Sequence, residues 1–309
     1  MKFCEKIQYG ILLGFCRAVG SLPKSFLYGG FLGFLYFLLY RVTGYRRSVV
    51  RDNLKRSFPE RSEQERRLIE RRFYRHLAEI FIDTISMTVI SEEELRKRIT
   101  YDGLDEHRRQ TDGHSWISAM AHYGSWEYAM SYQIYTTQQV VGVYKPLHNA
   151  AFERFYKRNR TRFGLEPVAM KRLLKYIVRN CVNQGKPISL GMIADQNPKL
   201  DEDRFWFRFL NQPTLFYHGM GTIAVKFGMP VYFMHIEKLG VARYRARFEM
   251  IYDGREAIGP NEVLGRYVAR LDAMIRRTPE LWMWSHRRWK HTPSPEELRE
   301  YELRNAITR

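Results

Sequence analysis

The most apolar part of the chain lies at its N-terminus. Residues 25–40 carry no charge, and extension back across Lys24 to Ala18 reaches the length of about 20 residues that a membrane span needs. A dense group of basic residues follows, namely Arg41, Arg46, Arg47 and Arg51. We expect residues 1–45 to be a spanning or interfacial anchor, and because positive flanks tend to stay in the cytoplasm, we expect the rest of the chain on the cytoplasmic side. A cleaved signal peptide and a buried soluble helix are two other interpretations.

After this segment, apolar positions first follow helical spacing. Pro59 ends an expected basic helix over residues 46–57. Ser62 and Glu65 form a capping box, and apolar residues then recur every three or four positions as far as Ile85. This pattern predicts a long amphipathic helix.

From about residue 115, short apolar runs alternate with helical segments. The expected strands are residues 115–121, 139–144, 187–194, 230–237 and 243–251, the last with the alternation of an antiparallel or edge strand. Helices are expected from about 126, after an N-cap at Asn149, and over about 170–183, 217–227 and 260–277. The alternation predicts an α/β fold with a mostly parallel central sheet flanked by helices. We expect one domain over 46–309, with a helical lead-in (46–110) and an α/β core (111–290).

Charge and cysteine content narrow the function classes. The net charge of +18 favours an anionic partner, whether nucleic acid, an anionic membrane surface or an acidic protein. The three cysteines are not in CxxC spacing, and no zinc pattern is present. A disulfide framework and a structural zinc site are therefore not expected, and the folded part is expected to face a reducing compartment.

Histidine followed five residues later by a carboxylate is the candidate catalytic motif. With 9 histidines and 33 acidic residues in 309, chance gives about one such pair, so spacing alone is weak evidence. The chain holds four: His107/Asp112, His122/Glu127, His148/Glu153 and His291/Glu296. Only the pair His122/Glu127 has its histidine at the carboxyl end of a clear strand and is followed by a glycine turn and a helix. Open α/β sheets bind their ligands at that edge.

The same local structure favours an interaction between the two side chains. In a continuous helix an offset of five residues would turn them apart by about 140°. With His122 in the strand-to-helix turn and Glu127 in the first helical turn, they can converge. A carboxylate on one imidazole nitrogen leaves the other as a general base. The alternative is a histidine that only caps the turn.

Five blocks of sequence resemble the bacterial late acyltransferases of lipid A biosynthesis, the lauroyl/myristoyl transferase family. They occur in the family's order and cover nearly the whole chain as far as about residue 290: AHYGSWEYA, VGVYKPLHNA, NRTRFG, MIADQNPK and LWMWSHRRWK. The second block has Lys145 where the family usually has arginine, which would weaken bidentate phosphate binding.

The resemblance implies a glycerophosphate-acyltransferase-like fold at the cytoplasmic face of the bacterial inner membrane. The implied donor is a fatty acyl thioester on acyl carrier protein, with no other cofactor and no metal, and the implied acceptor is a hydroxyl of an anionic lipid A precursor. His122 would take the proton from that hydroxyl, Glu127 would orient His122, and no covalent acyl-enzyme is required. The candidate substrate-binding residues are Lys145, Arg160, Arg162, Asp195, Gln196, Arg287 and Arg288.

Other interpretations of these residues stay open. Lys145, Arg160 and Arg162 are also typical of solvated faces, and Asp195 is typical of a turn before Asn197 and Pro198. The same fold serves acylation of other membrane lipids, such as ornithine or glycine aminolipids or lysophospholipids. A basic membrane- or nucleic-acid-binding protein without chemistry is the alternative from another class. Few aromatic residues are interleaved with basic ones as stacking platforms, so nucleic acid is not the expected partner.

Overall fold

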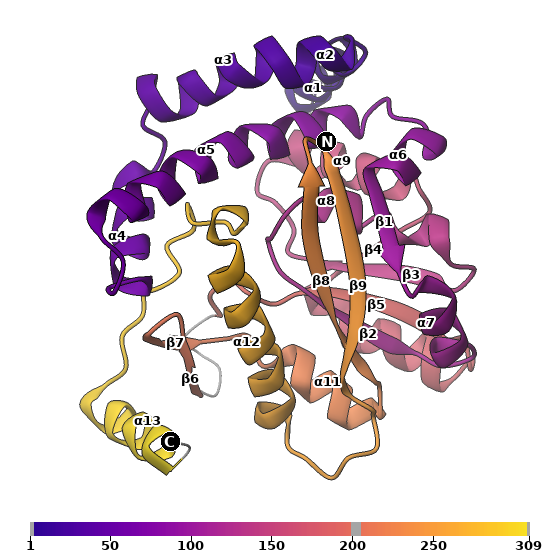
Figure 1. Cartoon of the computed structure of the whole chain (residues 1–309). Helices are drawn as coiled ribbons and strands as arrows, with labels where there is room; N and C mark the ends of the chain where they lie inside the picture. Colours follow the sequence, from indigo (N-terminus) through magenta and orange to yellow (C-terminus); the bar gives the residue numbers. More distant parts are fainter. Residues whose placement is uncertain (1–2, 199–204, 308–309) are drawn as a thin grey trace.

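The computed structural model describes residues 3–198 and 205–307 (Figure 1). The chain begins with helix α1 (Phe3–Gly20) and a second N-terminal helix, Lys24–Val42, in which π-helical turns interrupt α2 (Lys24–Phe26) and α3 (Leu32–Phe37). The lead-in helices are α4 (Arg47–Ser57), α5 (Glu63–Ser86) and α6 (Glu92–Arg98). Both N-terminal helices lie at the top of Figure 1, against α5. The predicted capping box is confirmed, because the Ser62 hydroxyl accepts from the Glu65 N–H while the Glu65 carboxylate accepts from the Ser62 N–H.

Seven strands form one sheet in the order β1-β9-β8-β2-β5-β3-β4. Their bounds are β1 (Ile99–Asp102), β2 (Trp116–Met120), β3 (Gln139–Tyr144), β4 (Glu166–Ala169), β5 (Ile188–Ile193), β8 (Val231–Gly240) and β9 (Arg243–Tyr252). Every neighbouring pair is parallel except β8 and β9. The predicted α/β fold with a mostly parallel sheet is therefore confirmed. A separate antiparallel hairpin joins β6 (Trp206–Phe209) to β7 (Gln212–Leu215).

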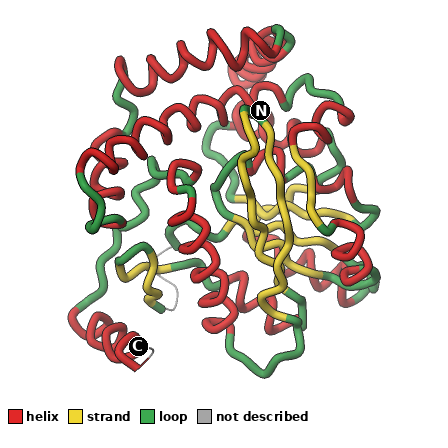
Figure 2. Tube along the Cα trace, in the orientation of Figure 1, coloured by secondary structure: helices red, strands yellow, loops and turns green. Residues whose placement is uncertain are grey.

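Helices cover both sides of this sheet (Figure 2). They are α7 (Leu104–Thr111), α8 (Trp126–Ala129), α9 (Ala150–Thr161), α10 (Leu173–Ile177), α11 (Gly219–Phe227) and α12 (Pro260–Arg277), and α13 (Pro295–Ile307) lies near the C-terminus. Asn149 is the N-cap of α9, as predicted, and its side chain accepts from two backbone N–H groups. The central strand β2 is buried at every position, so it carries its flanking residues to a fixed place.

Two strands of the central sheet were not predicted from the sequence, and neither was the β6–β7 hairpin. The first, β1, falls inside the expected helical lead-in, and the other, β4, follows α9. Each has only four residues, too few for a clear periodic pattern. The antiparallel pairing of β9 with β8 is confirmed, but β1 covers its other side, so β9 is not an edge strand.

Candidate active site

The register of two neighbouring parallel strands brings His122 and Asp195 together. Met120 at the end of β2 is paired with Ile193 at the end of β5. His122 and Asp195 each follow these positions by two residues, so they leave the sheet side by side at its carboxyl edge. This is the edge at which the sequence predicted the site.

The Asp195 carboxylate makes three contacts, to the His122 imidazole, to the His122 backbone and to Trp282. Its Oδ1 lies 2.8 Å from His122 Nδ1, and its Oδ2 accepts from the His122 backbone N–H at 3.0 Å. The Trp282 indole N–H also donates to Oδ2, at 2.8 Å. Burial raises the pKa of the Asp195 carboxyl, but the His122 charge and these hydrogen bonds outweigh burial, so the net pKa lies below its ordinary value. Asp195 is therefore an ionised acceptor that fixes the proton on Nδ1.

The turn after His122 is closed by a glycine and by the C-terminal segment. Gly124 has a φ of 59°, and a Cβ there would lie 2.7 Å from Ile236 Cγ2. The Gly124 N–H donates to the Leu281 carbonyl, and the Met283 N–H donates to the His122 carbonyl. The tryptophan-rich block near the C-terminus thus fixes the backbone on both sides of the histidine.

The expected interaction of Glu127 with His122 is wrong. Glu127 is buried in the first turn of α8, and its carboxylate forms an ion pair with Arg160 of α9, with Arg160 Nη2 at 2.7 Å from Oε1. The Trp126 indole N–H donates to the same oxygen at 3.2 Å. The spacing of five residues allows convergence, but the strand register supplies a different carboxylate for Nδ1. Glu127 reaches the site through Trp126, whose ring centroid lies 5.2 Å from that of His122.

Nε2 is the ring nitrogen of His122 that Asp195 does not bind. The His122 side chain is 21% exposed, whereas that of Asp195 is 2% exposed. The amide nitrogen of Gln196 lies 3.3 Å from His122 Nε2, so the predicted residue Gln196 borders the reactive nitrogen. Lys145 is exposed directly after β3, which pairs with β5, and so belongs to the same sheet edge. An imidazole whose Nδ1 proton is fixed by a carboxylate can accept a proton at Nε2, as general-base catalysis requires.

The four candidate arginines have different environments. Arg160 forms an ion pair with Glu127 and is mostly buried. Arg162 is exposed and donates a hydrogen bond to the Met87 carbonyl at 2.9 Å. Arg287 is exposed, and its backbone carbonyl accepts from the Asn197 amide.

The expectation that Arg288 faces the membrane or the acceptor is wrong. Its side chain is fully buried over the Phe216 ring, donates to Asn197 Oδ1 at 2.9 Å and donates to the Leu215 carbonyl. Burial lowers the pKa of Arg288 to about 10. The aromatic and polar residues of the β6–β7 hairpin and the Asn197 loop enclose this side chain. Arg288 therefore stabilises the loop that follows Asp195 from inside the protein.

Three residues of the site were not singled out from the sequence. Trp282 binds Asp195, and Asn197 joins the C-terminal segment through His286 Nε2 at 3.2 Å and the Arg287 carbonyl. Burial is the largest cause that lowers the pKa of His286, to about 4, so this histidine is neutral. Asp195, like His122, lies two residues after the end of a buried strand, and this shared position could have identified it as the partner of the histidine. No local pattern identifies Trp282.

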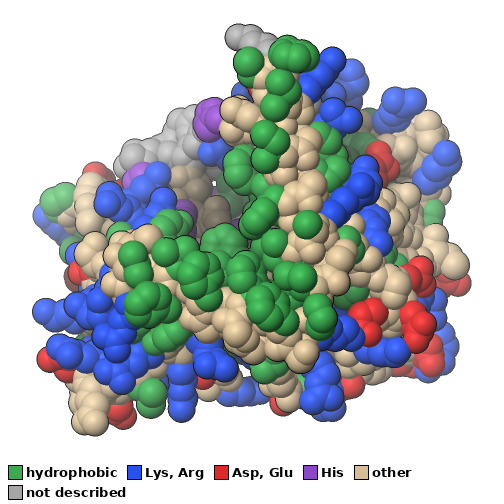
Figure 3. Space-filling model, turned by 90° about the horizontal axis from the view of Figure 1, so that it is seen from above, with side chains coloured by type: hydrophobic (Ala, Val, Ile, Leu, Met, Phe, Trp, Pro, Cys, Tyr) green, Lys and Arg blue, Asp and Glu red, His purple; other side chains and the backbone are tan. Residues whose placement is uncertain are grey.

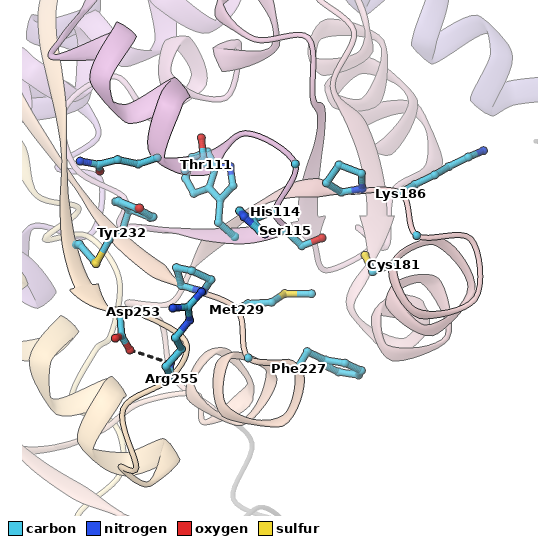
Figure 4. Close-up of a pocket in the computed structure, with 18 of the residues that line it drawn as sticks. Thr111, His114, Ser115, Cys181, Lys186, Phe227, Met229, Tyr232, Asp253 and Arg255 are labelled. Carbon is cyan, nitrogen blue, oxygen red and sulfur yellow. Dashed lines mark hydrogen bonds between the residues drawn. The ribbon is translucent and has the colours of Figure 1, made fainter.

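A cavity lies at the opposite edge of the sheet (Figure 4). This cavity of about 530 Å³ is lined by residues before β2, β5 and β8, including His114 and Cys181, and by Arg255 after β9. None of the candidate site residues lines it. Cys181 is therefore at the wrong edge to act as a nucleophile beside His122, and burial raises the pKa of its thiol.

A buried carboxyl connects the second N-terminal helix to the catalytic turn. Asp83 of α5 is fully buried and accepts from the Tyr28 hydroxyl at 2.8 Å and from the Tyr128 hydroxyl at 3.0 Å. Tyr28 belongs to the N-terminal helix and Tyr128 to α8. Burial, followed by the nearby charge of Glu79, raises the pKa of Asp83 to about 7.

Asp83→Asn is expected to make stability less dependent on pH. Because the fold binds a proton on Asp83 that the unfolded chain releases above about pH 4, this group lowers stability as pH rises from about 4 through 7. Asparagine keeps an acceptor for both tyrosines without a titratable charge. The melting temperature in detergent, measured from pH 5.5 to 8.5, should fall less for Asp83→Asn than for wild type. Parallel pH curves for the two proteins would contradict this role.

Comparison with known proteins assigns the chain to a family. The family model described as bacterial lipid A biosynthesis acyltransferase matches residues 4–291 of the 309. The match includes His122, Asp195 and the C-terminal tryptophan block. No curated protein matches the chain significantly.

Proposed function

The chain belongs to the bacterial lipid A biosynthesis acyltransferases, and we propose that it transfers a fatty acyl group from an acyl carrier protein thioester to a hydroxyl of a lipid A precursor. Membership of this family makes it an acyltransferase. The observation that carries the proposed mechanism is His122, whose Nδ1 lies on the buried carboxylate of Asp195 and whose side chain is 21% exposed.

In this mechanism His122 Nε2 accepts the proton from the acceptor hydroxyl as its oxygen attacks the thioester carbonyl. The carbon–oxygen bond forms, the carbon–sulfur bond breaks, and the imidazolium returns the proton to the leaving thiolate. Asp195 stabilises the imidazolium between these steps through its contact at 2.8 Å. An enzyme nucleophile is not needed, in keeping with the position of Cys181 at the opposite edge of the sheet. No cofactor beyond the acyl thioester is proposed.

Charge supports the proposed substrates. The net charge of +18 suits both an acidic carrier protein and an anionic glycolipid. Lys145 is exposed at the site edge and is proposed to bind an acceptor phosphate, together with the exposed Arg162 and Arg287. Arg160 is proposed to act through Glu127, because its guanidinium is already paired. We place the reaction at the cytoplasmic face of the bacterial inner membrane, whose anionic headgroups suit the net charge of +18.

The experiment that tests this function compares His122→Ala with wild type. General-base removal is expected to lower acyl transfer by 10²–10⁴-fold. We would incubate purified full-length protein with acyl carrier protein loaded with acyl chains of several lengths and with a lipid A precursor. Mass spectrometry would follow the products, and the lipid A of a deletion strain complemented with each variant would be compared.

The matched control is His114→Ala. His114 is an exposed histidine just before β2, so it lies at the other end of the strand that carries His122. It should retain wild-type activity. Acylation of an aminolipid or lysophospholipid with unchanged lipid A would refute the proposed acceptor. Full activity of a folded His122→Ala protein would refute the mechanism.

A further inference from the structure

Both N-terminal helices present an apolar face away from the body of the protein. On α1 the exposed residues recur every fourth position and therefore share one face: Phe3, Ile7, Ile11 and Phe15. On the second N-terminal helix the large exposed residues are Phe26, Phe34, Phe37 and Val42. Seen from above in Figure 3, hydrophobic side chains gather over this end of the molecule beside a hollow. Such a contiguous patch is typical of a surface that contacts lipid or protein.

The opposite face of the second N-terminal helix is docked along α5. Leu27 and Leu32 pack with Ala78 and Ile82 in one buried cluster. The two ends of the helix are held as well. Near its start the Tyr28 hydroxyl donates to Asp83 at 2.8 Å, and near its end the Tyr40 ring lies 5.1 Å from the Tyr74 ring. The helix is thus attached to the folded domain along its whole length.

This attachment conflicts with an upright membrane span. Lys24–Val42 is long and apolar enough to cross a membrane, with 19 residues and a mean hydropathy of 1.3. However, α5 runs beside it and exposes Arg71, Arg72 and Arg75. A spanning helix would carry these guanidinium groups into the hydrocarbon, which is costly. Alternatively, the second N-terminal helix would have to separate from α5, and the buried carboxyl of Asp83 would lose its hydrogen bond from Tyr28.

Exposed basic residues surround the apolar patch. Lys6 and Arg17 lie on α1, Arg41 lies on the second helix, and Arg158 lies on α9 beside α1. The charges of Arg17 and Arg158 are close enough to Arg162 to lower its pKa, after burial as the larger cause. Apolar residues bordered by cations match the acyl chains and headgroups of an anionic leaflet.

We propose that α1 and the second N-terminal helix lie in the plane of one membrane leaflet and that Lys24–Val42 does not cross the bilayer. Their apolar faces enter the acyl region, and the basic residues around them bind anionic headgroups. Beneath α1, Ala151 and Phe155 of α9 pack with Tyr9 and Cys16. The same helix α9 carries Arg160, the partner of Glu127. The leaflet surface therefore borders the candidate site, and a lipid acceptor reaches it without leaving the membrane.

Depth measurements along the second helix test this arrangement. Single cysteines replace Phe26, Phe34 and Val42 in full-length protein whose Cys4, Cys16 and Cys181 are changed to serine. Each cysteine carries an environment-sensitive fluorophore. The proteins are reconstituted into phosphatidylcholine–phosphatidylglycerol vesicles that contain lipids spin-labelled at a shallow or a deep acyl carbon. An in-plane helix predicts the same shallow depth at all three positions. A spanning helix predicts deep quenching at residue 34 and shallow quenching at residues 26 and 42, and this result would overturn the proposal.

Two controls accompany this measurement. A label at Gln64→Cys, exposed in the first turn of α5, should escape quenching by either lipid. Arg17→Gln and Arg158→Gln should each reduce the preference of the protein for phosphatidylglycerol-containing over neutral vesicles by about fivefold in flotation. Unchanged preference would refute the headgroup role.

A second copy of the chain could cover the apolar face instead. Labels shielded without vesicles, in a protein that sediments as a dimer, would show this and overturn the proposal. None of these measurements depends on acyl transfer, so the topology and the proposed reaction can fail separately.

Discussion

Asp195→Asn is expected to lower kcat for acyl transfer by about 10²–10⁴-fold while leaving KM nearly unchanged. The reason lies in the two oxygens of the carboxylate. Oδ2 accepts two N–H groups, from the His122 backbone and Trp282, while Oδ1 faces His122 Nδ1. Asparagine will place its carbonyl oxygen toward the two N–H donors, so its NH₂ group faces Nδ1. The imidazole must then carry its proton on Nε2, and it can no longer accept one from the hydroxyl.

The measurement is steady-state transfer by purified protein with saturating acyl carrier protein thioester. Trp282→Phe is the matched control, because it removes one donor from Asp195 but keeps the carboxylate and the tautomer. Its loss of kcat should be much smaller, at similar melting temperatures. An active Asp195→Asn protein would be incompatible with the proposed orientation of His122. It would favour another base or another carboxylate.

Sequence periodicity predicted the elements that local pattern determines. The long helix α5, the strand β2 and the turn at Gly124 all depend on residues within a short window, and each is where the pattern indicated. His122 could be chosen among nine histidines for the same reason. Its partner could not be chosen in this way. The contact with Asp195 depends on the register of β2 against β5, which joins residues 73 positions apart.

The same limitation explains the errors over Glu127 and Arg288. Each has a short-range context typical of a site, but long-range packing decides its partner. Glu127 meets Arg160 because the fold brings the C-terminal part of α9 within reach of α8. Arg288 is enclosed by the β6–β7 hairpin and the loop of Asn197. Charged residues in matched blocks thus include some that support the site from within the protein and do not face substrate.

Removal of either partner of the Glu127–Arg160 pair is expected to destabilise the fold by about 3–5 kcal/mol. The Glu127 side chain is 5% exposed and that of Arg160 is 19% exposed, so the remaining charge would stay buried and unpaired. Glu127→Ala is therefore expected to lower the melting temperature by several degrees or more. It should also lower activity, because Trp126 loses its acceptor and borders the His122 ring. The measurement is thermal unfolding of the detergent-solubilised protein alongside acyl transfer.

A double-mutant cycle distinguishes this structural role from a direct part in proton transfer. Glu127→Leu with Arg160→Met removes both charges and fills the space with apolar atoms, so the double variant should be more stable than either single variant. Activity should recover partly with stability, because the base and its carboxylate are both intact. If Glu127 instead carries protons for His122, the double variant will be stable and inactive. That result would return Glu127 to the dyad, with Asp195 serving only to hold the histidine backbone.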